Sequence, residues 1–164
     1  REQVGDLFGQ GVARLREVER HQRVTRQANS ASCFNLVGAA QVGKSSLTGM
    51  RVLHRLRGAI PVWPFDPVPE RGPVIIEIYT TVAAIAAGLS KGRSKVRDRA
   101  GLENALSRLD TDLPPPLLRY DDHSTDALIT AAWMKRVATD HALWNPPALT
   151  AAIAQKEGWT FGVI

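Results

Sequence analysis

Residues 33–56, CFNLVGAAQVGKSSLTGMRVLHRL, decide the expected fold class. Residues 34–37 form a short apolar run that predicts a strand. The apolar residues that follow recur at helical spacing and predict a helix with one apolar stripe. This stripe consists of Leu47, Met50, Leu53 and Leu56. The order strand, loop, helix is typical of an α/β protein.

The loop over 38–45 satisfies the phosphate-loop pattern G-x-x-x-x-G-K-[ST], through Gly38, Gly43, Lys44 and Ser45. Under one interpretation its backbone N–H groups cradle the phosphates of ATP or GTP, Lys44 reaches the outer phosphates and Ser45 holds magnesium. Under the other interpretation it is a tight turn that lets the helix pack back on a sheet. Nucleotide binding also needs an acidic residue at the end of a neighbouring strand, and the acid in the strongest predicted strand, Glu77, lies in its middle.

Composition is that of a globular protein, with 44% hydrophobic and 23% charged residues among 164, which is enough to build a core. The single cysteine excludes an internal disulfide and a cysteine-based metal cluster. No apolar run is long enough to span a membrane, and we expect a cytoplasmic protein. The net charge of +5 permits a nucleic-acid or phosphate partner.

Apolar spacing and turn residues divide the chain into short elements. Besides the helix after the loop, helices are expected over 12–27, 82–89, 102–109, 122–139 and 148–155. Strands are expected over 34–37, 60–65 and 74–79, and residues 158–164 are expected to form a hairpin-like strand or tail. We expect two parts, a basic helical segment over 1–32 and an α/β domain over 33–164.

The strand over 74–79, VIIEIY, carries a carboxylate at Glu77 among apolar residues. Burying an unpaired carboxylate is costly, so compensation is expected. The compensation is a metal ion, an arginine or a raised pKa of the carboxyl group. The structural alternative is an ion pair with Arg16 or Lys44.

A second group of acids opens the helix over 122–139. Asp122 and Asp126 lie one turn apart on the face that also carries Ile129 and Trp133, so Asp126 is predicted to point towards the core. The alternative is a structural role, with Asp122 or Ser124 as the N-cap and Asp126 favoured by the helix dipole.

These residues resemble a bacterial family of predicted RNase-H-like nucleases, itself a domain of unknown function. The resemblance covers about residues 15–163. Its marks are Arg16-x-x-Glu19, the run FNLVGAAQVGKSSLTGM, Trp63-Pro64-Phe65-Asp66, the strand around Glu77, Asp122-x-x-x-Asp126-Ala127 and Glu157-Gly158-Trp159. The run His123-x-x-Asp126-Ala127-Leu128 is also similar to the last acidic motif of RuvC-type resolvases.

The resemblance implies an RNase-H-like mixed sheet with flanking helices and a metal-dependent phosphodiester hydrolase. Its carboxylates would hold two Mg²⁺ or Mn²⁺ ions about 4 Å apart, which activate water for attack on a nucleic acid. Glu77, Asp126 and Asp122 would be the metal ligands, and His123 or Asp122 would assist them. Under the nuclease interpretation a basic strip of Lys91, Arg93, Lys95 and Arg97 would contact the phosphates of DNA or RNA, and the alternative is a solvated loop.

The chain departs from this family at its start. The family's first strand carries an aspartate, whereas residues 1–32 contain only Asp6, in a helical context. The chain therefore resembles the C-terminal part of such a protein, whose metal site would be incomplete and whose nuclease activity would be absent. The missing strands predict an exposed sheet edge, and hence either oligomerisation or an ill-formed domain. Two alternatives stay open: a nucleotide-binding phosphate-loop protein, and a non-catalytic interaction domain.

Overall fold

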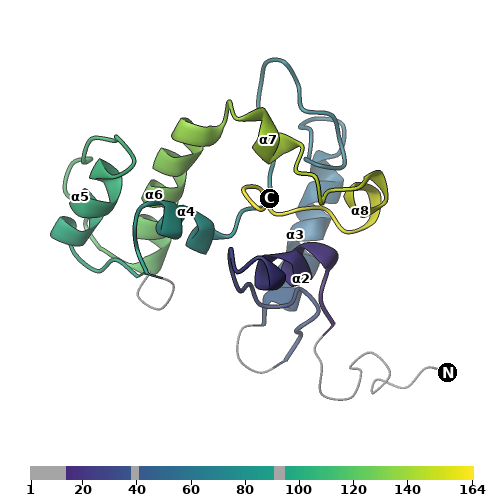
Figure 1. The fold of residues 1–164 in the computed structure, drawn as a ribbon, viewed down its shortest axis with the longest axis horizontal. Helices are drawn as coiled ribbons and strands as arrows, with labels where there is room; N and C mark the ends of the chain where they lie inside the picture. Colours follow the sequence, from purple (N-terminus) through teal and green to yellow (C-terminus); the bar gives the residue numbers. More distant parts are fainter. Residues whose placement is uncertain (1–13, 38–40, 91–94) are drawn as a thin grey trace. The chain divides into compact units, whose positions relative to one another are not determined.

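The structure is a computed structural model that describes residues 14–37, 41–90 and 95–164 (Figure 1). The chain divides into two compact units. Unit 1 comprises Arg1–Glu77 and Pro147–Val163, and unit 2 comprises Ile78–Pro146 and Ile164. Each unit is described by itself below.

Unit 1 contains the helices α2 (Glu17–Val24), α3 (Val42–Leu56) and α8 (Ala151–Lys156). Local sequence sets their ends. The Thr150 side chain accepts a hydrogen bond from the N–H of Ile153 at the start of α8. Gly58, at a φ of +81°, follows the last turn of α3, as expected of a glycine that ends a helix.

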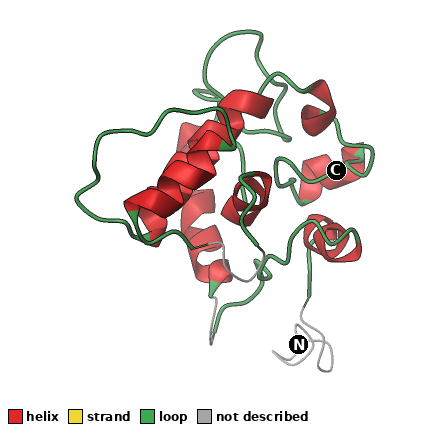
Figure 2. Cartoon of the chain, turned by 60° about the vertical axis from the view of Figure 1, so that its left-hand side comes forward, coloured by secondary structure: helices red, strands yellow, loops and turns green. Residues whose placement is uncertain are grey.

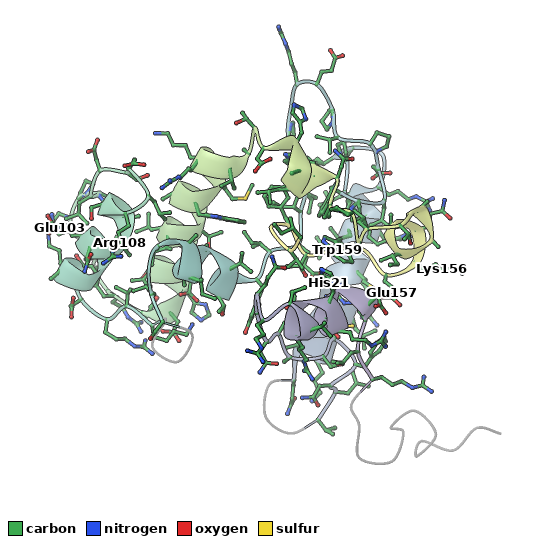
Figure 3. All side chains as sticks on the ribbon, viewed as in Figure 1. His21, Glu103, Arg108, Lys156, Glu157 and Trp159 are labelled. Carbon is green, nitrogen blue, oxygen red and sulfur yellow. The ribbon has the colours of Figure 1, made fainter. Side chains whose placement is uncertain are left out.

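The core of unit 1 is aromatic and lies close to the end of the chain. Trp63, Trp159 and Phe161 are buried, and the rings of Trp63 and Phe161 meet edge to face with centroids 5.8 Å apart. The indole N–H of Trp159 donates to the carbonyl oxygen of Val163, so this buried polar group is satisfied. Its ring also lies 5.7 Å from that of His21 on α2 (Figure 3).

Unit 2 contains the helices α4 (Thr80–Ala86), α5 (Arg99–Ser107), α6 (Asp122–Val137) and α7 (His141–Trp144). Helices α4 and α5 both pack against α6. Small residues of α4 let the helices approach closely, and the buried side chains include Ala83, Ala84, Leu102, Leu106, Ile129 and Trp133. Asp98 and Asp121 cap α5 and α6.

The prediction of an RNase-H-like mixed sheet is wrong. Figure 2 shows helices and loops, and the described residues contain two isolated parallel bridges, Val62 with Ile75 and Glu77 with Thr160, in place of strands. Residues 34–37 are a turn followed by irregular chain, and Phe34, Leu36 and Val37 are exposed, so the first predicted strand is absent. Oligomerisation was predicted from an exposed edge of this sheet. Because the described residues form no sheet, that reason for oligomerisation no longer applies.

Some backbone groups that face away from the two bridges are bonded locally. The N–H and C=O of Val62 face away from Ile75, and both are bonded by Asp66, through its carboxylate and its own N–H. In the second bridge, between Glu77 and Thr160, the carbonyl oxygen of Thr160 accepts a hydrogen bond from the N–H of Val163. A further strand would therefore have to displace these bonds to pair with Val62 or with the carbonyl oxygen of Thr160.

The predicted helices are confirmed in place, with shorter or shifted bounds. α2 covers the middle of the helix predicted over 12–27, and α4, α5, α6 and α8 correspond to the other four. The short helix α7 was not predicted. Within the described ranges, no helix combines the length and apolarity that crossing a membrane requires.

Candidate functional site

Glu77 of unit 1 is held by a two-pronged ion pair with Arg16. The guanidinium nitrogens of Arg16 lie 2.6 and 2.7 Å from the two carboxylate oxygens of Glu77. The hydroxyl of Thr160 donates to the same carboxylate at 2.8 Å. Of the partners that the sequence left open, the structure therefore gives Glu77 a structural cation, Arg16.

Arg16 also binds Glu19, which is 1% exposed. The Glu19 carboxylate accepts from Arg16 Nε at 3.1 Å, from the Arg16 backbone N–H at 2.9 Å and from the N–H of Cys33 at 2.9 Å. These contacts join the start of α2 to the segment after it. We call Arg16, Glu19, Glu77 and Thr160 the Arg16 cluster, and it holds distant parts of unit 1 together.

Electrostatics in the Arg16 cluster favour the charged forms. Partial burial opposes ionisation of Glu77, but the hydrogen bonds and charge of Arg16, together with Thr160, lower its pKa below the ordinary value. The pKa of Arg16 is raised, because Glu77 and Glu19 outweigh its burial. Burial and the charge of Glu19 raise the pKa of the Cys33 thiol to about 11, so it is not a reactive thiolate at neutral pH.

Asp126 and Asp122 of unit 2 share one cation. The Nζ atom of Lys95 lies 2.9 Å from Asp126 Oδ2 and 3.4 Å from Asp122 Oδ2. The hydroxyl of Thr80 donates to Asp126 at 3.2 Å, and Arg97 lies 2.7 Å from the second oxygen of Asp122. Asp126 and its hydrogen bond raise the pKa of Lys95. Two carboxylates and two cations thus form a neutral group.

The start of α6 differs from the prediction in one detail. The N-cap is Asp121, whose carboxylate accepts from the N–H of Ser124 at 3.0 Å, and not Asp122 or Ser124. This bond lowers the pKa of Asp121. Asp122 and Asp126 are therefore free of the capping role, whereas His123 is exposed on another side of the helix.

The glycine loop is partly described, since Gly38 lies outside the described residues. The N–H of Gly43 donates to the carbonyl oxygen of Asn35 at 3.0 Å, so one donor that a phosphate loop would offer is engaged. A Cβ on Gly43 would lie 2.6 Å from the carbonyl oxygen of Cys33. Gly43 is thus required by the close approach of α3 to residues 33–35, while Lys44 and Ser45 are exposed.

The candidate residues fall in both units. Glu77 belongs to unit 1, while Asp122 and Asp126 belong to unit 2, and each carboxylate has a cation of its own unit. Among the described residues no three His, Cys, Asp or Glu side chains gather closely enough to hold a metal ion. Lys91 and Arg93 lie outside the described ranges, and Lys95 and Arg97 are the partners of Asp126 and Asp122.

Sequence reasoning missed the buried role of Glu19. The apolar pattern of the first helix contained a signal, because Glu19 and Gln22 lie beside Val18 on the inward face, and all three are buried. No comparable signal exists for Lys95, which is 31 residues from Asp126.

Helix α3 differs from the acidic sites above because its exposed surface is apolar and basic. Gly43 is its one buried residue, and Leu47, Met50 and Val52 are about half exposed. Within the described chain α3 makes no extended packing against another helix. Residues 33–65 contain no Asp or Glu, whereas α3 and its end contribute Lys44, Arg51, Arg55 and Arg57.

Comparison with known proteins adds no relative. No family model matches the chain, and no curated protein or solved structure shows significant similarity to it.

Proposed function

We propose that this chain is a non-catalytic binding domain that holds an anionic partner on α3. The observation that carries the proposal is a contrast in charge pairing. The carboxylates that a catalytic role requires are neutralised by Arg16, Lys95 and Arg97. The cations of α3 form no ion pair with any described residue.

Unpaired cations on an exposed helix support anion binding for a simple reason. An arginine that already faces a carboxylate must lose that partner before it binds another anion, whereas Arg51 and Arg55 lose only water. Both lie one turn apart on the same face of α3, so one partner can reach both. Long-range attraction by the net charge of +5 adds to the rate of encounter.

The first experiment measures binding to heparin, used as a generic polyanion. We expect wild-type protein to bind labelled heparin with an affinity that falls steeply as salt is raised, because exposed charges are screened. The double variant Arg51→Gln with Arg55→Gln is expected to bind at least tenfold more weakly, about 1.4 kcal/mol.

A matched control removes the same charge elsewhere. Arg71 and Arg99 are exposed and have no ion pair with a described residue, so Arg71→Gln with Arg99→Gln leaves the same net charge. This control should keep heparin affinity within about threefold of wild type. Equal losses in the two double variants would refute a localised site on α3.

A metal-dependent phosphodiester hydrolase is the second candidate, and it depends on unit 2. The observation that favours it is that Asp122 and Asp126 converge on the ammonium of Lys95, a position that already holds a cation. Two carboxylates and the Thr80 hydroxyl could hold Mn²⁺ or Mg²⁺, with water or substrate phosphate as the remaining ligands. The ion would activate water and stabilise the leaving group.

Thermal unfolding with Mn²⁺ tests this second candidate. If the site binds, Mn²⁺ at ten times its dissociation constant stabilises the protein by about 1.4 kcal/mol, and Asp126→Asn abolishes the effect. Asp112→Asn, an exposed aspartate in the loop after α5, is the matched control and should keep it. Stabilisation that survives in Asp126→Asn, or that is absent from wild type, would contradict a metal site at Asp122 and Asp126.

A further inference from the structure

The exposed flank of α3 carries a stripe with helical spacing. A shallow hollow of about 460 Å³ is lined by Leu47, Met50, Arg51, His54 and Arg55, which we call the α3 stripe. Leu47 and Met50 are 53% and 55% exposed, unusual for large apolar side chains that share one patch. Such a surface loses water favourably when an apolar partner covers it.

The α3 stripe has one apolar side and one basic side. At about 100° per residue, Met50, His54 and Leu47 lie within about 60° of one another, and Arg51 and Arg55 continue the same arc. This order places a line of apolar contacts next to a line of positive charge. A partner that fits both must carry apolar anchors bordered by carboxylates.

We infer that the α3 stripe is the docking surface for an acidic amphipathic helix of a partner protein. Leucine-like anchors of that helix would fill the hollow between Leu47 and Met50, and its Asp or Glu side chains would pair with Arg51 and Arg55. Anchors at i, i+3, i+4 and i+7 are how helices bind apolar grooves, and methionine adapts well to such contacts. This inference rests on the proposed function and names its partner.

Three other occupants fit the stripe less well. A second copy that docked through its own α3 stripe would bring arginine against arginine, because residues 33–65 contain no acid. A lipid bilayer would meet one side of α3 only, yet the exposed Val52 lies about 160° round the helix from Met50. A nucleic-acid backbone would use the arginines but offers nothing for Leu47 and Met50.

The experiment compares two synthetic peptides on the full chain. One is a helical peptide of about 18 residues with leucines at i, i+3, i+4 and i+7 bordered by glutamates, and the other has the same composition in shuffled order. We expect the amphipathic peptide to bind wild-type protein at least tenfold more tightly than the shuffled peptide. Leu47→Ser with Met50→Ser should remove this preference.

A control variant separates the stripe from general apolar exposure. Val68 and Leu118 are also exposed, so Val68→Ser with Leu118→Ser should leave peptide binding within twofold of wild type. Equal binding of both peptides would overturn the acidic-helix inference while heparin binding through Arg51 and Arg55 still stood. If wild-type protein also failed to bind heparin, the proposed function itself would be refuted.

A vesicle arm distinguishes the lipid source. Vesicles of phosphatidylserine and phosphatidylcholine should bind wild-type protein at least tenfold more weakly than the amphipathic peptide does. The comparison uses the molar concentration of accessible lipid for the vesicles and the molar concentration of peptide for the peptide. Tighter binding to vesicles, lost in Leu47→Ser with Met50→Ser, would replace the protein partner by a membrane surface.

Discussion

Arg16→Met is expected to lower the free energy of unfolding by about 3–5 kcal/mol, as for removal of one partner from a buried ion pair. The Arg16 side chain is 14% exposed and the Glu19 side chain 1% exposed, so water cannot replace the guanidinium at Glu19. Glu77, at 45% exposure, is screened more and contributes less. Urea unfolding followed by tryptophan fluorescence measures the change, since Trp63 and Trp159 are buried in the same unit.

Arg20→Met is the matched control for this prediction. Arg20 pairs with Glu17 on the exposed side of the same helix, and such pairs contribute about 0–1 kcal/mol. If Arg16→Met costs no more than Arg20→Met, the Arg16 cluster does not hold unit 1 together.

The pH dependence of Arg16→Met provides a second measurement. Because the pKa of Glu77 is lowered in the folded protein, its pairing stabilises fully above the ordinary pKa of 4.5. The contribution is lost as pH falls through the lowered folded-state pKa. Wild-type protein should therefore lose stability in this acid range more steeply than Arg16→Met does.

Gly43→Ala is expected to destabilise the protein by about 1–3 kcal/mol, the cost of overpacking a close contact. Its Cβ would lie 2.6 Å from the carbonyl oxygen of Cys33 and 2.9 Å from that of Asn35, so backbone must move. The start of α3 would separate from residues 33–35 and lose the hydrogen bond from Gly43 to Asn35. Thermal unfolding followed by far-ultraviolet circular dichroism measures the loss.

Gly49→Ala in the same helix is the control. Apart from its chain neighbours and the backbone of its own helix, no described atom lies within 4 Å of a Cβ at Gly49, so alanine should stabilise α3 by up to about 1 kcal/mol through its better helix propensity. Equal effects at the two glycines would show that α3 is not held against residues 33–35, and would favour the phosphate-loop interpretation again.

Helices were predictable because their signal is local. The spacing of Leu47, Met50, Leu53 and Leu56 gave α3 its place, and Ile129 and Trp133, both buried, did the same for α6. The sheet was not predictable, because a strand depends on partners elsewhere in the chain. Residues 74–79 have the composition of a central strand, yet Ile75 and Glu77 find one paired residue each.

The candidate site was predictable in kind but not in detail. A carboxylate within the apolar run 74–79 indicated that its charge needs compensation, but the sequence left a metal ion, a raised pKa and an ion pair with Arg16 or Lys44 open. The structure shows the ion pair with Arg16 and a lowered pKa of Glu77, so the raised pKa was wrong. The choice depends on a contact between residues 61 positions apart. That Glu77, Asp122 and Asp126 hold metal together stays a prediction.

Unit 1 consists of two separate stretches of the chain, which affects how the protein folds during its synthesis on the ribosome. Unit 2 is almost entirely one uninterrupted stretch, Ile78–Pro146, and can collapse during synthesis before the rest of the chain emerges. The hydroxyl that bonds Glu77 arrives 83 residues later, with Thr160. Trp159 and Phe161 are likewise synthesised long after Trp63, so the nascent chain would carry an incomplete aromatic core until translation nears these residues.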